Sequence, residues 1–174
     1  MIITLIGMPG AGKSSVGKAL ARHLDYCFID TDTLIREHSG KALQKLIDEK
    51  GDFALIEVEE ECILSLELQD NCIISTGGSV IYSEKAMYFL QGRSCIIFLD
   101  VPFGIIKNRL SNIDTRGVVG LKSKGLYQLY KERSRIYADF ADIRIRVKGK
   151  NKIRDVMEKI VARTSVEPCM SDDI

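Results

Sequence analysis

The sequence lacks a hydrophobic run long enough to span a bilayer, and it lacks an excess of charge of either sign. Its 25 lysines and arginines nearly match its 24 aspartates and glutamates, so the net charge is +1 and a surface for DNA or RNA is not expected. The apolar stretch Ile2–Ile6 has no basic residue before it and stops at Gly7, which is not the pattern of a signal peptide. These absences predict a soluble, cytoplasmic protein with neither a membrane nor a nucleic-acid partner.

Cysteine is also too sparse and too irregular for a disulfide framework or a zinc site. The five cysteines are an odd number, and no two of them are spaced as C-x-x-C. Most lie within apolar runs, where a free thiol behaves as a small hydrophobic side chain. We therefore expect buried thiols, as in most cytosolic proteins. They are Cys27, Cys62, Cys72, Cys95 and Cys169.

What the chain has instead is an alternation of short apolar runs and longer amphipathic stretches. The apolar runs predict strands at residues 2–6, 27–30, 72–75, 94–99 and 143–147. The amphipathic stretches predict helices at 12–23, 84–90, 126–140 and 152–162, a helix opened by Pro102, and a helix-rich region at 32–68 broken at Gly40 and Gly51. Apolar strands separated by helices favour an α/β fold, with a five-stranded parallel sheet sandwiched by helices. The length predicts one domain, at residues 1–165, and a tail at 166–174.

A phosphate-binding loop follows the first predicted strand and opens the first predicted helix. Gly7–Ser14 matches G-x-x-x-x-G-K-[ST] in the structural context that this motif requires. Its glycines let backbone N–H groups turn towards phosphate oxygens, while Lys13 neutralises charge and Ser14 offers a hydroxyl to Mg²⁺. A glycine-rich turn that only joined a strand to a helix would need neither residue. The motif predicts that ATP and Mg²⁺ bind at Gly10, Ala11, Gly12, Lys13, Ser14 and Ser15.

Three aspartates at predicted strand ends are candidates for the metal site and for the base. Asp30 and Asp32 are two residues apart after the second strand, so one of them can serve the metal with Ser14 and the other an attacking hydroxyl. The alternative is that both cap the next helix. Asp100 is better explained as a residue at the start of a helix, where a carboxylate suits the helix dipole.

A polar stretch at residues 111–125 has three glycines and little periodicity, and it is long for a connection in a small domain. These properties favour a mobile lid that closes over the reacting groups. Arg116 within it can stabilise charge on the transferring phosphate. The alternative is a solvated surface arginine.

Taken in order, these motifs resemble the shikimate kinase family over about residues 1–160. Any one of them beyond the phosphate loop is weak by itself, whereas the ordered set is specific. The family anchors, as they stand here, are Gly7–Ser14, Phe28–Asp32, Ile74–Gly78, Thr115-Arg116 and Arg133–Tyr137. The resemblance implies a P-loop kinase fold with a mobile lid.

For the nucleotide side, the resemblance implies that Asp30 reaches Mg²⁺ through water and that Arg109 lies near the adenine. Lys150 matches the family's adenine loop only loosely. Arg116 would close on the transferring phosphate.

For the acceptor side, the resemblance implies that Asp32 holds the reacting hydroxyl and acts as the base. Gly77 and Gly78 would donate backbone N–H groups to the acceptor, and Arg133 would contact its carboxylate. From the residues alone, Arg133 is equally well explained as part of a charged helix face.

The sequence departs from the family pattern on the acceptor side. Ile56 stands where the family has an arginine that binds the acceptor carboxylate, and an isoleucine forms no such pair. Ser79 replaces a third glycine, Gly117 replaces a proline, and Arg36 replaces an acidic residue. Arg36, four residues after Asp32, can replace the missing guanidinium or form an ion pair with a neighbouring carboxylate. We expect shikimate to be either a poor substrate or a stand-in for a less acidic acceptor.

The sequence thus predicts a monomeric, ATP-dependent kinase that phosphorylates a hydroxyl of a small metabolite, with shikimate as the leading candidate. The alternatives are a kinase of another polyol, a sugar acid or a nucleoside monophosphate, and a nucleotide-binding regulatory module without catalysis.

Arg116→Ala is expected to lower the rate of phosphoryl transfer with little effect on nucleotide affinity, because a lid arginine acts once the lid has closed. Steady-state kinetics with titrated ATP measures both quantities. Protease cleavage within residues 111–125 should also slow when ATP and the acceptor are bound together. Unchanged cleavage would identify this stretch as an ordinary surface loop.

Overall fold

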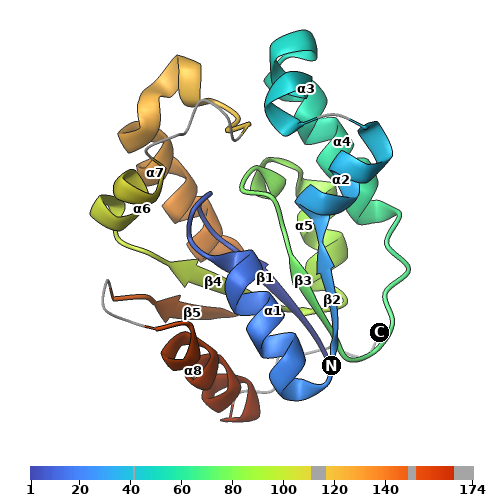
Figure 1. The fold of residues 1–174 in the computed structure, drawn as a ribbon, viewed down its shortest axis with the longest axis vertical. Coiled ribbons are helices and arrows are strands. Elements are labelled where there is room, and N and C mark those ends of the chain that lie inside the picture. Colours follow the sequence, from blue (N-terminus) through green and yellow to red (C-terminus); the bar gives the residue numbers. More distant parts are fainter. Residues whose placement is uncertain (41, 111–116, 149–151, 167–174) are drawn as a thin grey trace.

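A five-stranded parallel sheet forms the centre of the computed structural model, which describes residues 1–40, 42–110, 117–148 and 152–166. The strands are β1 (Ile2–Ile6), β2 (Cys27–Asp30), β3 (Cys72–Ser75), β4 (Cys95–Asp100) and β5 (Ile143–Arg146). Their order is β2-β3-β1-β4-β5, and every neighbouring pair is parallel (Figure 1). The predicted sheet is confirmed.

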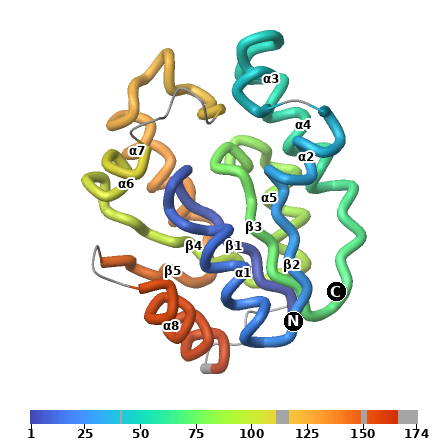
Figure 2. The backbone as a smooth tube through the Cα atoms, viewed as in Figure 1, coloured from blue at the N-terminus to red at the C-terminus, as the bar shows by residue number. Residues whose placement is uncertain are grey.

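Helices cover both faces of this sheet. They are α1 (Lys13–Leu24), α2 (Thr31–Ser39), α3 (Leu43–Lys50), α4 (Asp52–Leu64), η1 (Val80–Tyr82), α5 (Glu84–Gln91), α6 (Phe103–Arg109), α7 (Leu121–Phe140) and α8 (Ile153–Val166). In Figures 1 and 2, α1 and α8 lie side by side in front of the sheet, and α5 lies behind it. The predicted breaks at Gly40 and Gly51 are confirmed, with φ angles of 63° and 85°. Over the described ranges, no helix combines the length and the apolarity that a membrane crossing requires.

The core lies between the sheet and these helices. Residues of the inner strands β1, β3 and β4 are buried except Ile2 and Asp100 at two strand ends, because helices cover both faces. The edge strand β5 differs: Ile143 and Ile145 are buried, whereas Arg144 and Arg146 are exposed. The carboxyl ends of β1 and β3 are thus packed inside the protein, and those ends carry the motifs.

One prediction about cysteine is wrong. Cys27 and Cys72, which were expected to be buried thiols, form a disulfide between β2 and β3. The two residues are register partners on neighbouring strands, which brings their side chains together although 45 positions separate them. The sequence contains no sign of this pairing, because the two cysteines are brought together only by the register of β2 and β3.

The predicted lid at residues 111–125 is only partly within the described residues. Arg116 lies outside them. Leu121 to Gly125 belongs to α7 and is not a loop: the left-handed Gly120 starts the helix, and Gly125 kinks it with a φ of 72°. The segment before α7 contacts the neighbouring helices, since the N–H groups of Gly117 and Gly120 donate to Gln44 (3.0 Å) and Asp52 (2.9 Å).

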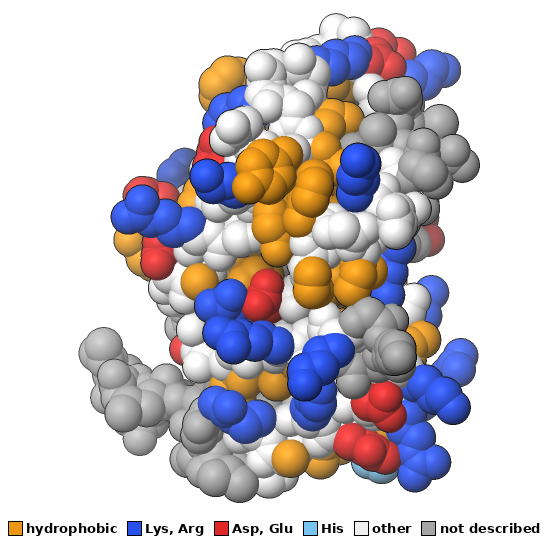
Figure 3. Space-filling model, turned by 90° about the vertical axis from the view of Figure 1, so that its left-hand side faces the viewer, with side chains coloured by type: hydrophobic (Ala, Val, Ile, Leu, Met, Phe, Trp, Pro, Cys, Tyr) orange, Lys and Arg blue, Asp and Glu red, His pale blue; other side chains and the backbone are white. Residues whose placement is uncertain are grey.

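Aromatic packing fixes α6 against α7. The ring of Phe103 meets Tyr127 edge-on, with centroids 5.0 Å apart, and lies 5.3 Å from Tyr130. The Tyr130 hydroxyl donates to the Val101 carbonyl at 3.2 Å. Hydrophobic side chains gather among lysines and arginines on the face shown in Figure 3. The packing of Phe103 against Tyr127 and Tyr130 thus positions α6, and Arg109 at its end, relative to α7.

We expect Gly17→Ala to destabilise the protein by up to about 2 kcal/mol. A Cβ at Gly17 in α1 would lie 2.6 Å from the ring of Phe28, and overpacking of about 1–3 kcal/mol outweighs a gain in helix propensity of up to about 1 kcal/mol. Urea denaturation measures the change. Gly104→Ala in α6 is the matched control, because nothing lies within 4 Å of its Cβ, and it should be neutral or stabilising. Equal behaviour of the two variants would contradict this packing.

Candidate active site

The phosphate-binding loop joins β1 to α1, as the motif predicts. Gly10 and Gly12 have φ angles of 79° and 96°, in the left-handed region that favours glycine. A Cβ at Gly7 would lie 3.0 Å from the Leu99 carbonyl oxygen. Glycines are therefore required in this loop, both for its left-handed turns and for its close approach to the backbone of β4.

Lys13 places a buried cation at the start of α1. Its Nζ donates to the carbonyls of Gly7 (2.8 Å) and Met8 (3.2 Å), and the side chain is almost fully buried. Burial lowers the pKa of Lys13 to about 8, against the opposite effect of Asp32. The ammonium group thus remains mostly charged near neutral pH and can neutralise phosphate oxygens.

A cavity of about 710 Å³ lies beyond the carboxyl ends of the strands. All six predicted loop residues from Gly10 to Ser15 line it, and so do residues predicted for the acceptor. Both sets therefore share one space, as direct transfer between two substrates requires. Side chains that line it and carry charge are Lys13, Asp32, Arg36, Glu59, Arg109 and Arg133.

The nucleotide side of the cavity is bordered by α6 and α8. Arg109 Nη1 donates to the carbonyls of Gly10 (3.1 Å) and Ala11 (3.4 Å), so this guanidinium lies against the phosphate-binding loop. Val147 and Ile153 add apolar lining that suits a flat base. Lys150, between them in sequence, lies outside the described residues.

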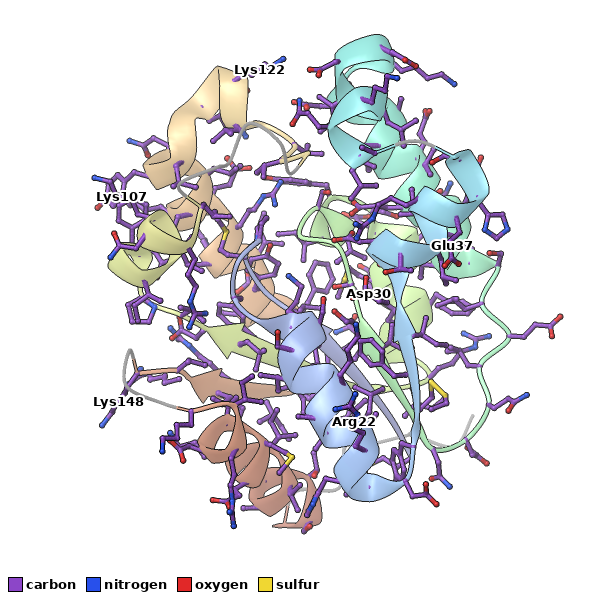
Figure 4. All side chains as sticks on the ribbon, viewed as in Figure 1. Arg22, Asp30, Glu37, Lys107, Lys122 and Lys148 are labelled. Carbon is purple, nitrogen blue, oxygen red and sulfur yellow. A yellow bond between two sulfur atoms is a disulfide. The ribbon has the colours of Figure 1, made fainter. Side chains whose placement is uncertain are left out.

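The two aspartates at the start of α2 have different environments. Asp30 caps the helix, with Oδ1 accepting from the N–H (3.2 Å) and the hydroxyl (3.4 Å) of Thr33. Figure 4 shows Asp30 where β2 passes into α2. Asp32 lines the cavity, and its buried Oδ1 has no hydrogen-bond partner in the described parts of the chain. Burial raises the pKa of Asp32, and Lys13 opposes the rise. The capping alternative therefore holds for Asp30 and fails for Asp32.

Oxygen atoms suited to Mg²⁺ gather where β2, β3 and α1 meet. Ser14 Oγ lies 3.3 Å from Ser75 Oγ, and Asp30 is the register partner of Ser75. These hard oxygen donors fit a hydrated magnesium ion that is bound mainly by phosphate and water. Within the ranges that the structure describes, no three His, Cys, Asp or Glu side chains form a cluster for a metal. Asp100 is engaged elsewhere, because its Oδ2 accepts from Arg144 at 2.9 Å and 3.1 Å.

Arg133 is part of the cavity wall, and the interpretation as a charged surface face is wrong. It is 1% exposed, and its Nη1 and Nη2 each donate at 2.8 Å, to the carbonyls of Gly78 and Val119. Tyr137 donates to the same Gly78 carbonyl at 2.6 Å. These bonds fix a buried cation beside the turn that follows β3.

The turn after β3 is close to the carboxylates. A Cβ at Gly77 would overlap the Glu59 carboxylate and lie 2.9 Å from Asp32 Oδ1, so only glycine fits there. One predicted contact differs from the structure: the N–H of Gly77, expected to donate to the acceptor, donates to Thr31 Oγ1 at 3.1 Å. The chain direction after β3 points this N–H at α2, which leaves Gly78 as the predicted donor.

Glu59 is a site residue that the sequence analysis missed. It is 3% exposed, and its Oε2 has no hydrogen-bond partner among the described residues. Burial raises its pKa to about 7, and a hydrogen bond from Ser79 opposes the rise. A signal existed in the sequence, because Leu55, Glu59 and Ile63 are four residues apart and lie on the buried face of α4. A glutamate on an apolar helix face indicates a partner inside the protein.

The chain is similar to known proteins over nearly its whole length. The sequence profile of a family described as shikimate kinase matches residues 9–165. A shikimate kinase of Aquifex aeolicus (strain VF5) is 32% identical over 161 residues, which make up 92% of this chain and 94% of that protein.

Solved structures agree with these relatives. A shikimate kinase from Acinetobacter baumannii in complex with shikimate has a TM-score of 0.85 and 26% identity, over 95% of this chain and 92% of that one. The shikimate kinase from Aquifex aeolicus vf5 has a TM-score of 0.80 and 31% identity, over 95% and 96%.

The sheet order, the phosphate-binding loop and the shared cavity define a P-loop phosphotransferase. Within that class, the chain belongs to the shikimate kinase family. It is an ATP-dependent enzyme whose acceptor is an alcohol group, and both the predicted family and the predicted reaction type are confirmed. The expectation of a departed acceptor site finds no support among these relatives, which are all described as shikimate kinases.

The raised pKa of Glu59 predicts a pH-dependent stability. The carboxyl ionises at about 7 in the fold and near 4.5 in the unfolded chain, so the folded state keeps a proton that the unfolded state releases between these values. Stability is therefore lost as the pH rises through this window. Glu59→Gln stays neutral and should gain stability relative to the wild type as the pH rises from 4.5 to 8, by on the order of 3 kcal/mol.

Chemical denaturation of both proteins across this pH range measures the difference. Glu57→Gln, at an exposed position of the same helix, is the matched control and should track the wild type at every pH. A difference between Glu59→Gln and the wild type that does not change with pH would contradict the assigned pKa.

Proposed function

We propose that the chain transfers the γ-phosphoryl group of ATP to a hydroxyl of shikimate, with Asp32 as the base. The observation that carries this proposal is the buried, unpaired Oδ1 of Asp32 in the same cavity as Lys13 and the phosphate-binding loop. The family supports shikimate as the acceptor. The proposal treats residues 1–165 as one domain that acts as a monomer.

The nucleotide is held by the start of α1. Backbone N–H groups of the loop and the helix dipole attract the phosphates, and Lys13 supplies a charge that is already directed into the cavity. Ser14 would bind Mg²⁺ directly, and Asp30 would bind it through water. The ion supplies charge neutralisation on the β- and γ-phosphates when it is bound. Arg109, together with Lys150, would border the base.

The acceptor is held between α2, α4 and the turn after β3. Asp32 accepts the proton of the attacking hydroxyl while the hydroxyl oxygen of the acceptor forms a bond to the γ-phosphorus. The bond from that phosphorus to the bridging oxygen breaks, and ADP leaves with the electron pair. Burial raises the pKa of Asp32 towards neutral pH, and a base with a higher pKa takes a proton more readily. Gly78 and Arg133 would position the acceptor, and Arg116 would close over the phosphate.

Asp32→Asn should lower kcat with shikimate by about 10²- to 10⁴-fold, because an amide cannot take the proton, while the KM for ATP changes little. Lys13→Ala should abolish turnover in a folded protein. ADP release, coupled to NADH oxidation, measures both, and circular dichroism checks the fold. Asp30→Asn is the comparison, and it should raise the Mg²⁺ requirement instead. A wild type that releases no ADP in response to shikimate would overturn the proposed acceptor.

A further inference from the structure

Four cationic side chains line the cavity, and three of them also donate to backbone carbonyls through their charged groups. Lys13 donates to loop carbonyls, and Arg109 donates to two more carbonyls of the same loop. Arg133 donates one hydrogen bond from Nη1 and one from Nη2 to backbone carbonyls of the cavity wall, and each nitrogen carries a second N–H. The fourth is Arg36, on α2.

Arg36 is held by one atom and leaves the rest of its guanidinium available. Its Nε donates to the Asp32 carbonyl at 2.9 Å. Across the described residues, no hydrogen bond or ion pair engages Nη1 or Nη2, although the side chain borders the cavity. The expected ion pair with the Asp32 carboxylate is therefore not formed. A guanidinium tethered at Nε keeps the N–H donors of Nη1 and Nη2 for a carboxylate.

The position of Arg36 suits an acceptor that reacts at Asp32. The two residues are four apart on α2, and such side chains are neighbours about 5–6 Å apart on one helix face. A cyclic hydroxy acid carries its carboxylate and a hydroxyl on different ring atoms, at a separation of this order. The hydroxyl of such an acceptor would meet Asp32, and its carboxylate would meet the guanidinium of Arg36.

The lining residues next to Arg36 in the described part of the chain add no further positive charge. Ile56 on α4 packs against an apolar cluster that includes Ile35, Leu55 and Val119, so this wall adds no positive charge. Ala42 and Leu43 line the cavity near the start of α3 and are apolar as well. Arg36 therefore adds a second arginine beside Arg133 on the acceptor side of a cavity that also holds the carboxylates of Asp32 and Glu59.

We propose that Arg36 binds the carboxylate of the acceptor and so determines its selection. This inference rests on the proposed function, and it makes Arg36 a binding residue for an anionic hydroxy acid. It also explains how an acceptor with a carboxylate is accommodated although position 56 is an isoleucine.

The test compares two acceptors that differ only in charge, shikimate and its methyl ester, in the wild type and in Arg36→Ala. The variant should raise the KM for shikimate by about 10- to 100-fold, the usual effect of losing a charged hydrogen-bonding partner. The KM values for ATP and for the ester should stay within about twofold. Arg36→Lys should recover part of the affinity, because it keeps the charge and loses the two-pronged geometry.

Arg22→Ala is the matched control. Arg22 is an exposed arginine in the last turn of α1, away from the cavity lining, and its removal should leave every constant unchanged (Figure 4). Thermal denaturation of all variants reports the fold.

Three results would overturn the assignment of Arg36. One is an unchanged KM for shikimate in Arg36→Ala, and another is an equal loss for shikimate and the ester, which would show a structural role. Both results would leave the proposed function intact, because the wild type would still phosphorylate shikimate. The third is a wild type without any shikimate turnover, which would overturn the proposed function first and this inference with it.

Discussion

This site depends on the electrostatic attraction between buried acidic and basic side chains. Lys13, Glu59 and Arg133 are almost fully buried, and the Oδ1 of Asp32 is buried as well. Burial alone would drive each group towards its neutral form, raising the pKa of the acids and lowering that of the lysine. The opposite charges nearby limit these shifts. A cation for the phosphates and a base for the hydroxyl therefore share one cavity, where removing either leaves the other poorly compensated.

The parallel sheet brings these groups together. Strands that run in the same direction end at the same edge, so the segments that follow β1, β2 and β3 meet although they are far apart in sequence. The register pairs Asp30 and Leu5 with Ser75 on either side of β3. Glycine at position 77 then allows the turn after β3 to approach the carboxylates of Asp32 and Glu59.

Local chemistry explains which features could be predicted. Apolar runs gave the strands within one residue at either end, and Gly40 and Gly51 gave the helix breaks, because their effect on the backbone is intrinsic. The disulfide between Cys27 and Cys72 was missed because register, not spacing, makes it. Glu59 lies on an apolar face of α4 that the sequence shows, but its neighbours Ser79 and Gly77 follow β3 and are distant in sequence, so its place in the site was missed.

The sequence by itself determined the phosphate-binding loop, the class of the enzyme and the order of strands and helices along the chain. These depend on contiguous residues whose chemistry acts over a few positions. Only the tertiary structure decided which charged groups are buried and which are available. Arg133 belongs to a helix rich in charge yet is enclosed, and Asp30 caps a helix while Asp32 faces the cavity. Arg36 is tied to a backbone carbonyl through Nε, and no hydrogen bond among the described residues engages its Nη1 or Nη2. Burial and hydrogen-bond partners come from segments that meet only in the folded chain, so the pattern of any single segment does not contain them.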